Sequence, residues 1–178
     1  MILLAFRIGA LSAMLCFWVG PGCHNESDER IGVLIDRAAA NGVKLDRQWF
    51  SVRAQLIAHN LTDSKLLCDI IDAKKPGTLT GVELIGSELD ERAFHCLSTV
   101  SSLENLNVSQ SSISMRELLL FEGKRGIRWI GLAGCNLPEE QTMYFLLSLE
   151  NLDVLYPPDS LSEKSIKEIR SRGVTVFE

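Results

Sequence analysis

The 178-residue sequence lacks a basic surface. Aspartate and glutamate outnumber lysine and arginine by 23 to 18, and the net charge is −5. No run rich in lysine or arginine alternates with aromatic residues, which is the pattern that binds phosphates and stacks on bases. We therefore expect no nucleic-acid partner.

The sequence also lacks the residue patterns of common catalytic and metal sites. It contains no glycine-rich phosphate loop, no nucleophile elbow and no closely spaced pair of metal ligands. Histidine occurs only three times. The adjacent His95 and Cys96 would diverge by about 100° on a helix and could not easily share a ligand. We therefore expect a protein that is not an enzyme, with no catalytic residue, no bound metal and no cofactor.

What the sequence does contain is a repeated pattern of apolar residues at fixed offsets. Three copies begin at Leu79, Leu103 and Ile127, each 24 residues after the last (103 − 79 and 127 − 103), and a looser fourth begins at Leu149. Repetition at this period is typical of a solenoid, in which each unit buries its apolar face against its neighbours.

Each copy predicts a short strand followed by a helix. The apolar residues alternate with period two, as in a strand with one buried face. Helix-start signals then follow the strands: an acidic N-terminus, a capping box, a proline before two acids, and a serine before an acid. These signals are, in chain order, Asp90-Glu91, Ser114-Met115-Arg116-Glu117, Pro138-Glu139-Glu140 and Ser162-Glu163.

Further elements are expected at both ends of the repeats. An earlier, degenerate copy fits the same frame, with Ala54 in the place of Val82, 28 residues later (82 − 54). Its helix begins at Thr62-Asp63. Residues 31–41 predict a short amphipathic helix that covers the first repeat, since terminal repeats usually need a cap. The apolar residues after Gly173 predict a last strand.

The pattern resembles the leucine-rich repeat family, whose consensus is L-x-x-L-x-L-x-x-N/C-x-L. The resemblance covers residues 51–178. It implies an α/β fold: a short right-handed solenoid with a parallel sheet on the concave side and helices on the convex side. The residues at the position that the consensus gives to asparagine or cysteine are His59, Ser87, Ser111, Cys135 and Pro157.

The N-terminus predicts an exported protein in three parts. Residues 1–23 read as a secretory leader, because an apolar core with Arg7 near its start is followed by small residues. Cys23 after Gly22 resembles the lipobox of bacterial lipoproteins, which implies a lipid on Cys23 and a membrane tether. Plain secretion and an uncleaved, membrane-retained leader stay open as alternatives. Residues 24–50 then form a polar linker and the N-terminal capping helix, before the repeat domain.

Three cysteines fall within the repeats. Cys68 follows Leu61 by seven residues, as Cys96 follows Leu89, so both are expected at equivalent positions of adjacent helices. Neighbouring helices pack about 8–10 Å apart, whereas a disulfide needs Cα atoms within about 7 Å. We expect two separate buried thiols, with a bridge only if the helices pinch together. Cys135 is left without a partner.

The concave face supplies the candidate binding residues. The residues expected to project from it are Gly81, Glu83, Ile85, Asn105, Asn107, Ser109, Trp129, Gly131, Ala133, Asn151, Asp153 and Leu155. Trp129, beside glycine and alanine, would form a flat platform with room for a partner side chain, as in binding hot spots. Tyr156 would extend it; alternatively, Trp129 packs against the last repeat. The partner-binding candidates are Trp129, Asn105, Asn107, Glu83, Asp153 and Tyr156.

The expected function is therefore recognition. The protein would be an exported, membrane-tethered module that binds a protein or peptide on its concave sheet. The alternative is a structural component of the cell envelope that self-associates through its helical side or its sheet edges.

Overall fold

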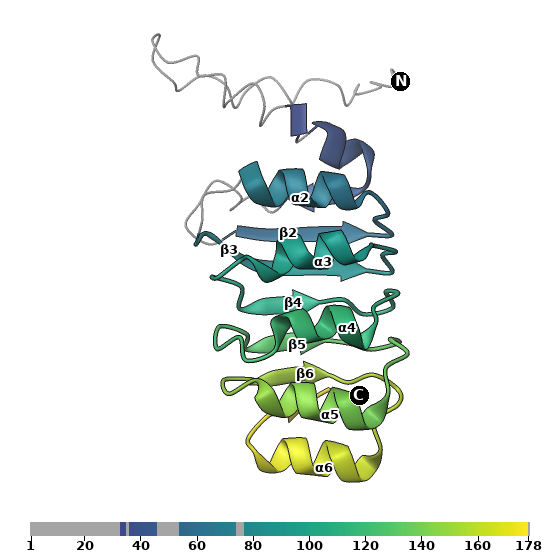
Figure 1. Cartoon of the computed structure of the whole chain (residues 1–178), viewed down its shortest axis with the longest axis vertical. Coiled ribbons are helices and arrows are strands. Elements are labelled where there is room, and N and C mark those ends of the chain that lie inside the picture. Colours follow the sequence, from purple (N-terminus) through teal and green to yellow (C-terminus); the bar gives the residue numbers. More distant parts are fainter. Residues whose placement is uncertain (1–32, 35, 46–53, 74–76, 178) are drawn as a thin grey trace, which may run out of the picture.

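A computed structural model describes residues 33–34, 36–45, 54–73 and 77–177. The predicted leader and Cys23 lie outside these residues. The described part is an α/β structure whose sheet follows the order of the chain, β1 to β7 (Figure 1). The strands are β1 (Val43–Leu45), β2 (Ala54–His59), β3 (Leu79–Ile85), β4 (Asn105–Asn107), β5 (Trp129–Gly131), β6 (Val154–Tyr156) and β7 (Thr175–Val176).

The strands from β2 to β7 are parallel, and each pairs with the next along the chain. Gly81 pairs with Asn105, and Asn105 pairs with Trp129, so three strands repeat at an offset of 24 residues. This confirms the predicted α/β class with a parallel sheet. Strand β1 runs antiparallel to β2. It was not predicted, because its three residues fall where a linker and a helix were expected and are too few to display an alternation.

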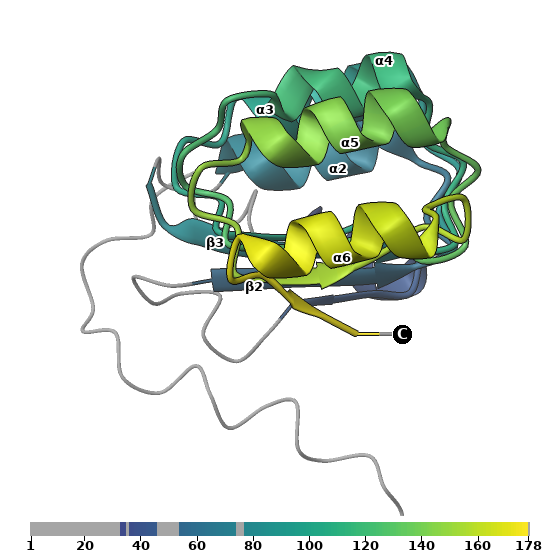
Figure 2. The ribbon, with the colours of Figure 1, turned by 90° about the horizontal axis from the view of Figure 1, so that it is seen from below.

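The helices α2 to α6 lie on one side of the sheet (Figure 2). Their bounds are α2 (Ser64–Ala73), α3 (Glu91–Ser98), α4 (Met115–Leu118) with the 3₁₀ turn η1 (Leu119–Phe121), α5 (Glu139–Ser148) and α6 (Glu163–Ser171). The helices α3 to α6 start at the predicted signals. The Ser114 hydroxyl accepts from the Glu117 N–H, and the Glu117 carboxylate accepts from the Ser114 N–H, which completes the capping box. Pro138 is the N-cap of α5 rather than its first residue.

The hydrophobic core fills the space between the sheet and these helices. One inward residue from each of five neighbouring strands is completely buried, and the pairing places these residues in one row. They are Leu56, Val82, Leu106, Ile130 and Leu155. Phe94, Phe121 and Phe145 are buried among them from the helical side. Each strand from β2 to β6 therefore contributes an apolar side chain to a single continuous core.

The turn after each strand is also repeated. One residue there has a positive φ: 54° at Asn60, 64° at Gly86, 59° at Gln110 and 71° at Gly134. Asn60, Gly86 and Gln110 each donate their backbone N–H to a carbonyl of the next strand or the loop after it. Non-glycine residues rarely adopt this conformation. Its recurrence at the same position shows that four successive strands end in the same way.

Buried side chains connect these turns. The Ser87 hydroxyl accepts from the Leu61 N–H at 3.1 Å, and the Ser111 hydroxyl accepts from the Ser87 N–H at 3.0 Å. The Cys135 thiol donates to the Val108 carbonyl at 3.1 Å. Burial raises the pKa of this thiol. Serine and cysteine thus satisfy backbone groups that would otherwise be buried without a partner.

The predicted register of the first repeat is wrong by two residues. Strand β2 pairs with β3 at an offset of 26, so Leu56 lies beside Val82, and His59 lies beside Ile85 rather than Ser87. A shift by two residues leaves the same side chains inward, so the alternation in β2 fits either register. Residue 61, not His59, is therefore equivalent to Ser87.

The predicted register of the fourth repeat is wrong by an odd number of residues, which reverses its faces. Leu155 pairs with Ile130 and is completely buried, whereas it was expected to project outward. Val154, expected inward, and Tyr156 point to the opposite face. A one-residue slip exchanges the two faces of a strand. Pro157 follows Tyr156, which pairs with Gly131, so it is not equivalent to Cys135.

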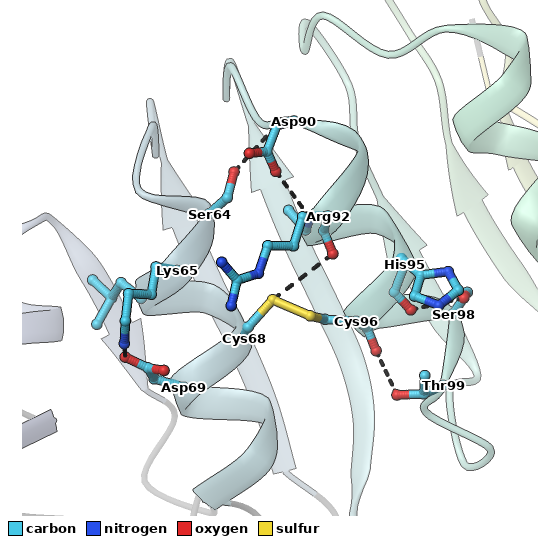
Figure 3. Close-up of a disulfide and its surroundings, with 12 residues drawn as sticks. Ser64, Lys65, Cys68, Asp69, Asp90, Arg92, His95, Cys96, Ser98 and Thr99 are labelled. Carbon is cyan, nitrogen blue, oxygen red and sulfur yellow. Dashed lines mark hydrogen bonds and ion pairs between the residues drawn. A yellow bond between two sulfur atoms is a disulfide. The ribbon is translucent and has the colours of Figure 1, made fainter.

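The expectation of two separate thiols is also wrong. Cys68 of α2 and Cys96 of α3 form a disulfide, with their Cα atoms 5.6 Å apart (Figure 3). At the true offset of 26, the equivalent of Cys68 is Phe94, and Cys96 lies two residues further. Two residues turn a side chain by about 200° around a helix. The buried position therefore goes to Phe94, and Cys96 points toward α2.

Candidate functional site

The site lies on the face of the sheet turned away from α2 to α6, here called the outer face. Pairing of β3, β4 and β5 places Asn105 beside Trp129, and Glu83 beside Asn107. These four candidates project from three adjacent strands, at spacings of about 4.8 Å per strand. All four are half-buried. The structure thus brings these four together, and Tyr156, a fifth of the six predicted residues, lies against Trp129 from the next strand.

Three aromatic residues form a strip across the last three strands. The ring centroids of Trp129 and Tyr156 are 5.4 Å apart with the planes tilted by 58°, and those of Tyr156 and Phe177 are 5.0 Å apart and nearly parallel. Such pairs are favourable beyond the area that they bury. Tyr156 remains 36% exposed and Phe177 45% exposed. The aromatic strip, Trp129–Tyr156–Phe177, therefore packs within the molecule and also exposes ring surface to solvent.

Trp129 packs as the alternative interpretation predicted, and its role as a binding platform stays a prediction. Its ring packs against Tyr156 of the last repeat, and it is still half-buried rather than buried. Phe177 was missed by the sequence analysis, although a signal existed. Val174 is buried and Val176 is half-buried, so period-two alternation places Thr175 and Phe177 on the outer face.

A hollow adjoins Trp129 on the outer face. It has a volume of about 130 Å³ and is lined by Gln55, Gly81, Glu83, Asn105 and Trp129. Gly81 gives the Gln55 side chain room, because a Cβ at position 81 would lie 3.0 Å from the Gln55 Cγ. Gln55 was not predicted as a site residue, although the alternation in β2 places it on the outer face in either register. We call this the Trp129 hollow.

The polar side chains of the Trp129 hollow have no partner within the described part of the chain. No hydrogen bond or ion pair there involves the side chain of Gln55, Glu83 or Asn105, and no buried polar atom lacks a partner. Their donors and acceptors therefore face solvent. Asn107 differs, because its Oδ1 accepts from the Ser109 N–H at 3.0 Å. Asn107 shapes the face, whereas the other three can bind a ligand.

The space expected above Gly131 is occupied. A Cβ at position 131 would lie 2.9 Å from the Asn107 Cγ and 3.0 Å from the Ser109 hydroxyl oxygen. The prediction that Gly131 leaves room for a partner side chain is therefore wrong. Gly131 instead makes room for Asn107. The accessible hollow is the Trp129 hollow, which Gly131 does not line.

No family model matches this chain. No curated protein or solved structure matches it either. The function of this protein is therefore inferred from the described residues. They contain no cluster of three or more histidine, cysteine, aspartate or glutamate side chains fit to hold a metal ion. None of their helices is long and apolar enough to cross a bilayer.

Asp153 does not belong to the outer-face site. It precedes β6, and its Oδ2 lies 2.6 Å from the Arg128 Nη2. It lines a separate, highly charged hollow at the N-terminal ends of the strands, together with Arg125, Glu150 and Arg172. Arg125 pairs with Glu150 at 3.3 Å. Misassignment of the β6 register explains why Asp153 was expected on the same face as Trp129.

Proposed function

We propose that this protein is a recognition module of the leucine-rich repeat type, which binds a protein or peptide on its outer face. The repeat assignment is supported by the 24-residue offset of β3, β4 and β5 and by the positive φ that recurs after β2, β3, β4 and β5. The hydrogen bonds of Ser87, Ser111 and Cys135 support it too, since they occupy the position that the consensus gives to asparagine or cysteine.

The aromatic strip is the observation on which the recognition role depends. Partly exposed tryptophan and tyrosine are enriched at the centres of protein interfaces, because they add large contact area with few rotatable bonds. The Trp129 hollow lies beside the strip and adds unpaired polar groups that can set specificity. Exposed rings next to unpaired donors and acceptors favour a binding role over a catalytic one.

We propose that the protein is exported from the cytoplasm. A disulfide between Cys68 and Cys96 supports it, because such bonds persist in oxidising environments outside the cytoplasm. The predicted leader supports it independently. Cys23 would then tether the protein to a membrane through lipid, which leaves the repeats free to meet a partner at the cell surface.

Self-association within the cell envelope has less support. The last strand, β7, has only two residues and offers few backbone groups to a second chain. The Arg170 guanidinium also donates to the Val176 carbonyl at 3.4 Å.

Sedimentation velocity of the protein distinguishes the two roles. A reversible dimer that persists in Trp129→Ala would favour self-association.

Partner capture tests the recognition role. Crosslinking in the native cell should recover a partner with the wild-type protein, and Trp129→Ala should reduce recovery by about tenfold or more, as expected for a hot-spot residue. Tyr144→Ala is the matched control, because Tyr144 is an aromatic residue that is 60% exposed on α5, on the helical side. Equal recovery with Trp129→Ala and Tyr144→Ala would contradict the proposal.

A further inference from the structure

We propose that the Trp129 hollow binds one cationic side chain, an arginine or a lysine, of the partner peptide. This inference depends on the recognition role proposed above and adds the chemistry of the residue that is recognised. It follows from three features of the hollow: an unpaired carboxylate, neighbouring amide groups, and the ring of Trp129.

The carboxylate is that of Glu83. It is the only ionisable group among the five residues that line the hollow. Two acids elsewhere pair with arginine: Glu91 lies 2.8 Å from Arg116, and Asp153 lies 2.6 Å from Arg128. No such pair involves Glu83 in the described part of the chain. The described residues thus leave this carboxylate without a counter-charge, which a cationic ligand would supply.

The other lining residues suit a cation as well. The amides of Gln55 and Asn105 add carbonyl oxygens that accept hydrogen bonds, and a guanidinium has five N–H donors to fill such acceptors. The indole of Trp129 attracts a cation to its face. A volume of about 130 Å³ suits the end of one side chain rather than a longer segment of peptide.

Neutral and acidic side chains fit the hollow less well. A neutral group would cover the Glu83 carboxylate without supplying a counter-charge, and a buried charge without a partner is costly. An acidic group would be repelled by it. Charge complementarity therefore favours arginine or lysine at the position of the peptide that lies against Trp129.

A titration of the full chain with small probes tests this inference. The probes are N-acetyl-arginine methylamide, the lysine equivalent, and the neutral citrulline equivalent, which preserves the shape of arginine. Binding is followed by NMR at the indole N–H of Trp129 and the side-chain amides of Gln55 and Asn105. We expect saturable shifts with the cationic probes and about tenfold weaker binding of the citrulline probe.

Two variants sharpen the test. Glu83→Gln should remove the preference for the cationic probes, because it deletes the charge and preserves the shape. Glu88→Gln should retain the preference, since Glu88 is exposed and does not line the hollow. Equal binding of arginine and citrulline probes, an unchanged preference in Glu83→Gln, or no saturable shift with either cation would overturn the inference.

The two proposals can fail separately. If partner capture depends on Trp129 while the probes show no charge preference, the cation inference fails and the recognition role stands. If capture does not depend on Trp129, the recognition role fails, whatever the probes show.

Discussion

Amide side chains determine the contour of the outer face at the scale of single residues. Asn107 lies over Gly131, and Gln55 lies over Gly81. In both cases the glycine on the neighbouring strand has no Cβ, which makes room for the amide. Asn107 is held by the Ser109 N–H, whereas the Gln55 amide has no partner among the residues described. Each glycine therefore accommodates one amide: Asn107 is fixed in place, whereas Gln55 can bind a ligand.

Gly131→Ala should destabilise the protein by about 1–2 kcal/mol. The new Cβ would displace Asn107 and break its hydrogen bond with the Ser109 N–H. The free energy of unfolding, measured by urea denaturation, checks this. In an Asn107→Ala background the same substitution should cost much less, since the obstructing amide is absent. Additive effects of the two substitutions would show that Asn107 and Gly131 do not interact in this way.

Glu139 should make stability depend on pH in the acid range. Hydrogen bonds from Ser162 and Ser165 lower the pKa of its carboxyl from 4.5 to about 2. A depressed folded-state pKa means that the unfolded chain binds the proton more readily. This stabilisation is therefore complete above pH 4.5, the unfolded value, and is lost as the pH falls from 4.5 to about 2.

Glu139→Gln is the corresponding variant. Its melting temperature should be below that of the wild type at pH 7, and the two should converge as the pH approaches 2. Glu140→Gln, at the neighbouring exposed position of α5, is the control and should follow the wild type throughout. A constant difference between wild type and Glu139→Gln across the acid range would contradict this role of the carboxylate.

At the scale of elements, the first two helices of the repeats are joined most firmly. The disulfide links α2 to α3, and the Asp90 N–H donates to the Ser64 hydroxyl at 3.1 Å where these helices begin (Figure 3). Asp90 also accepts from the Ala93 N–H as the N-cap of α3. Hydrogen bonds from Ser64 and Ala93 lower the pKa of the Asp90 carboxyl. The disulfide and these hydrogen bonds thereby hold α2 against α3.

Replacement of Cys68 and Cys96 together by serine should destabilise the protein by about 3–4 kcal/mol, because the bond closes a loop with a sequence separation of 28. Chemical denaturation without reductant measures this, and wild type in reductant should behave like the double variant. Cys135→Ser is the control, since a hydroxyl can make the bond that the Cys135 thiol makes to Val108. If reductant leaves the wild-type midpoint unchanged, the predicted stabilisation is wrong.

At the scale of the whole molecule, the two faces of the sheet have different roles. The helices cover one side, and the aromatic strip and the Trp129 hollow lie on the other. The proposed binding on the outer face would therefore leave the core and the disulfide undisturbed. A tether at Cys23, which lies outside the described residues, would precede the repeats in the chain and leave this face available.

Expression of the full chain in a bacterium tests the tether. We expect the protein in the membrane fraction, with a mature N-terminus at Cys23 that has the mass of an attached lipid. Cys23→Ser should abolish the lipid mass, and Cys16→Ser should not, because Cys16 lies inside the predicted leader. A soluble product without lipid would support plain secretion, and a retained leader would support the membrane anchor.

Much of the fold could be predicted from the sequence because it depends on local chemistry. Period-two alternation identified β3, β4 and β5, and short-range capping signals located the starts of α3 to α6. The 24-residue period then predicted which strands lie side by side, since equal repeats can only stack in the order of the chain. The outward positions of Glu83, Asn105, Asn107 and Trp129 followed from the same alternation.

Only the tertiary structure decided the register of the end repeats. β2 pairs with β3 at an offset of 26, and β6 pairs with β5 at an offset of 25, so the 24-residue period does not extend to them. Those registers arise from packing between strands that are distant in the chain, which no local signal encodes. The disulfide and the position of Asp153 away from the outer-face site both follow from these offsets.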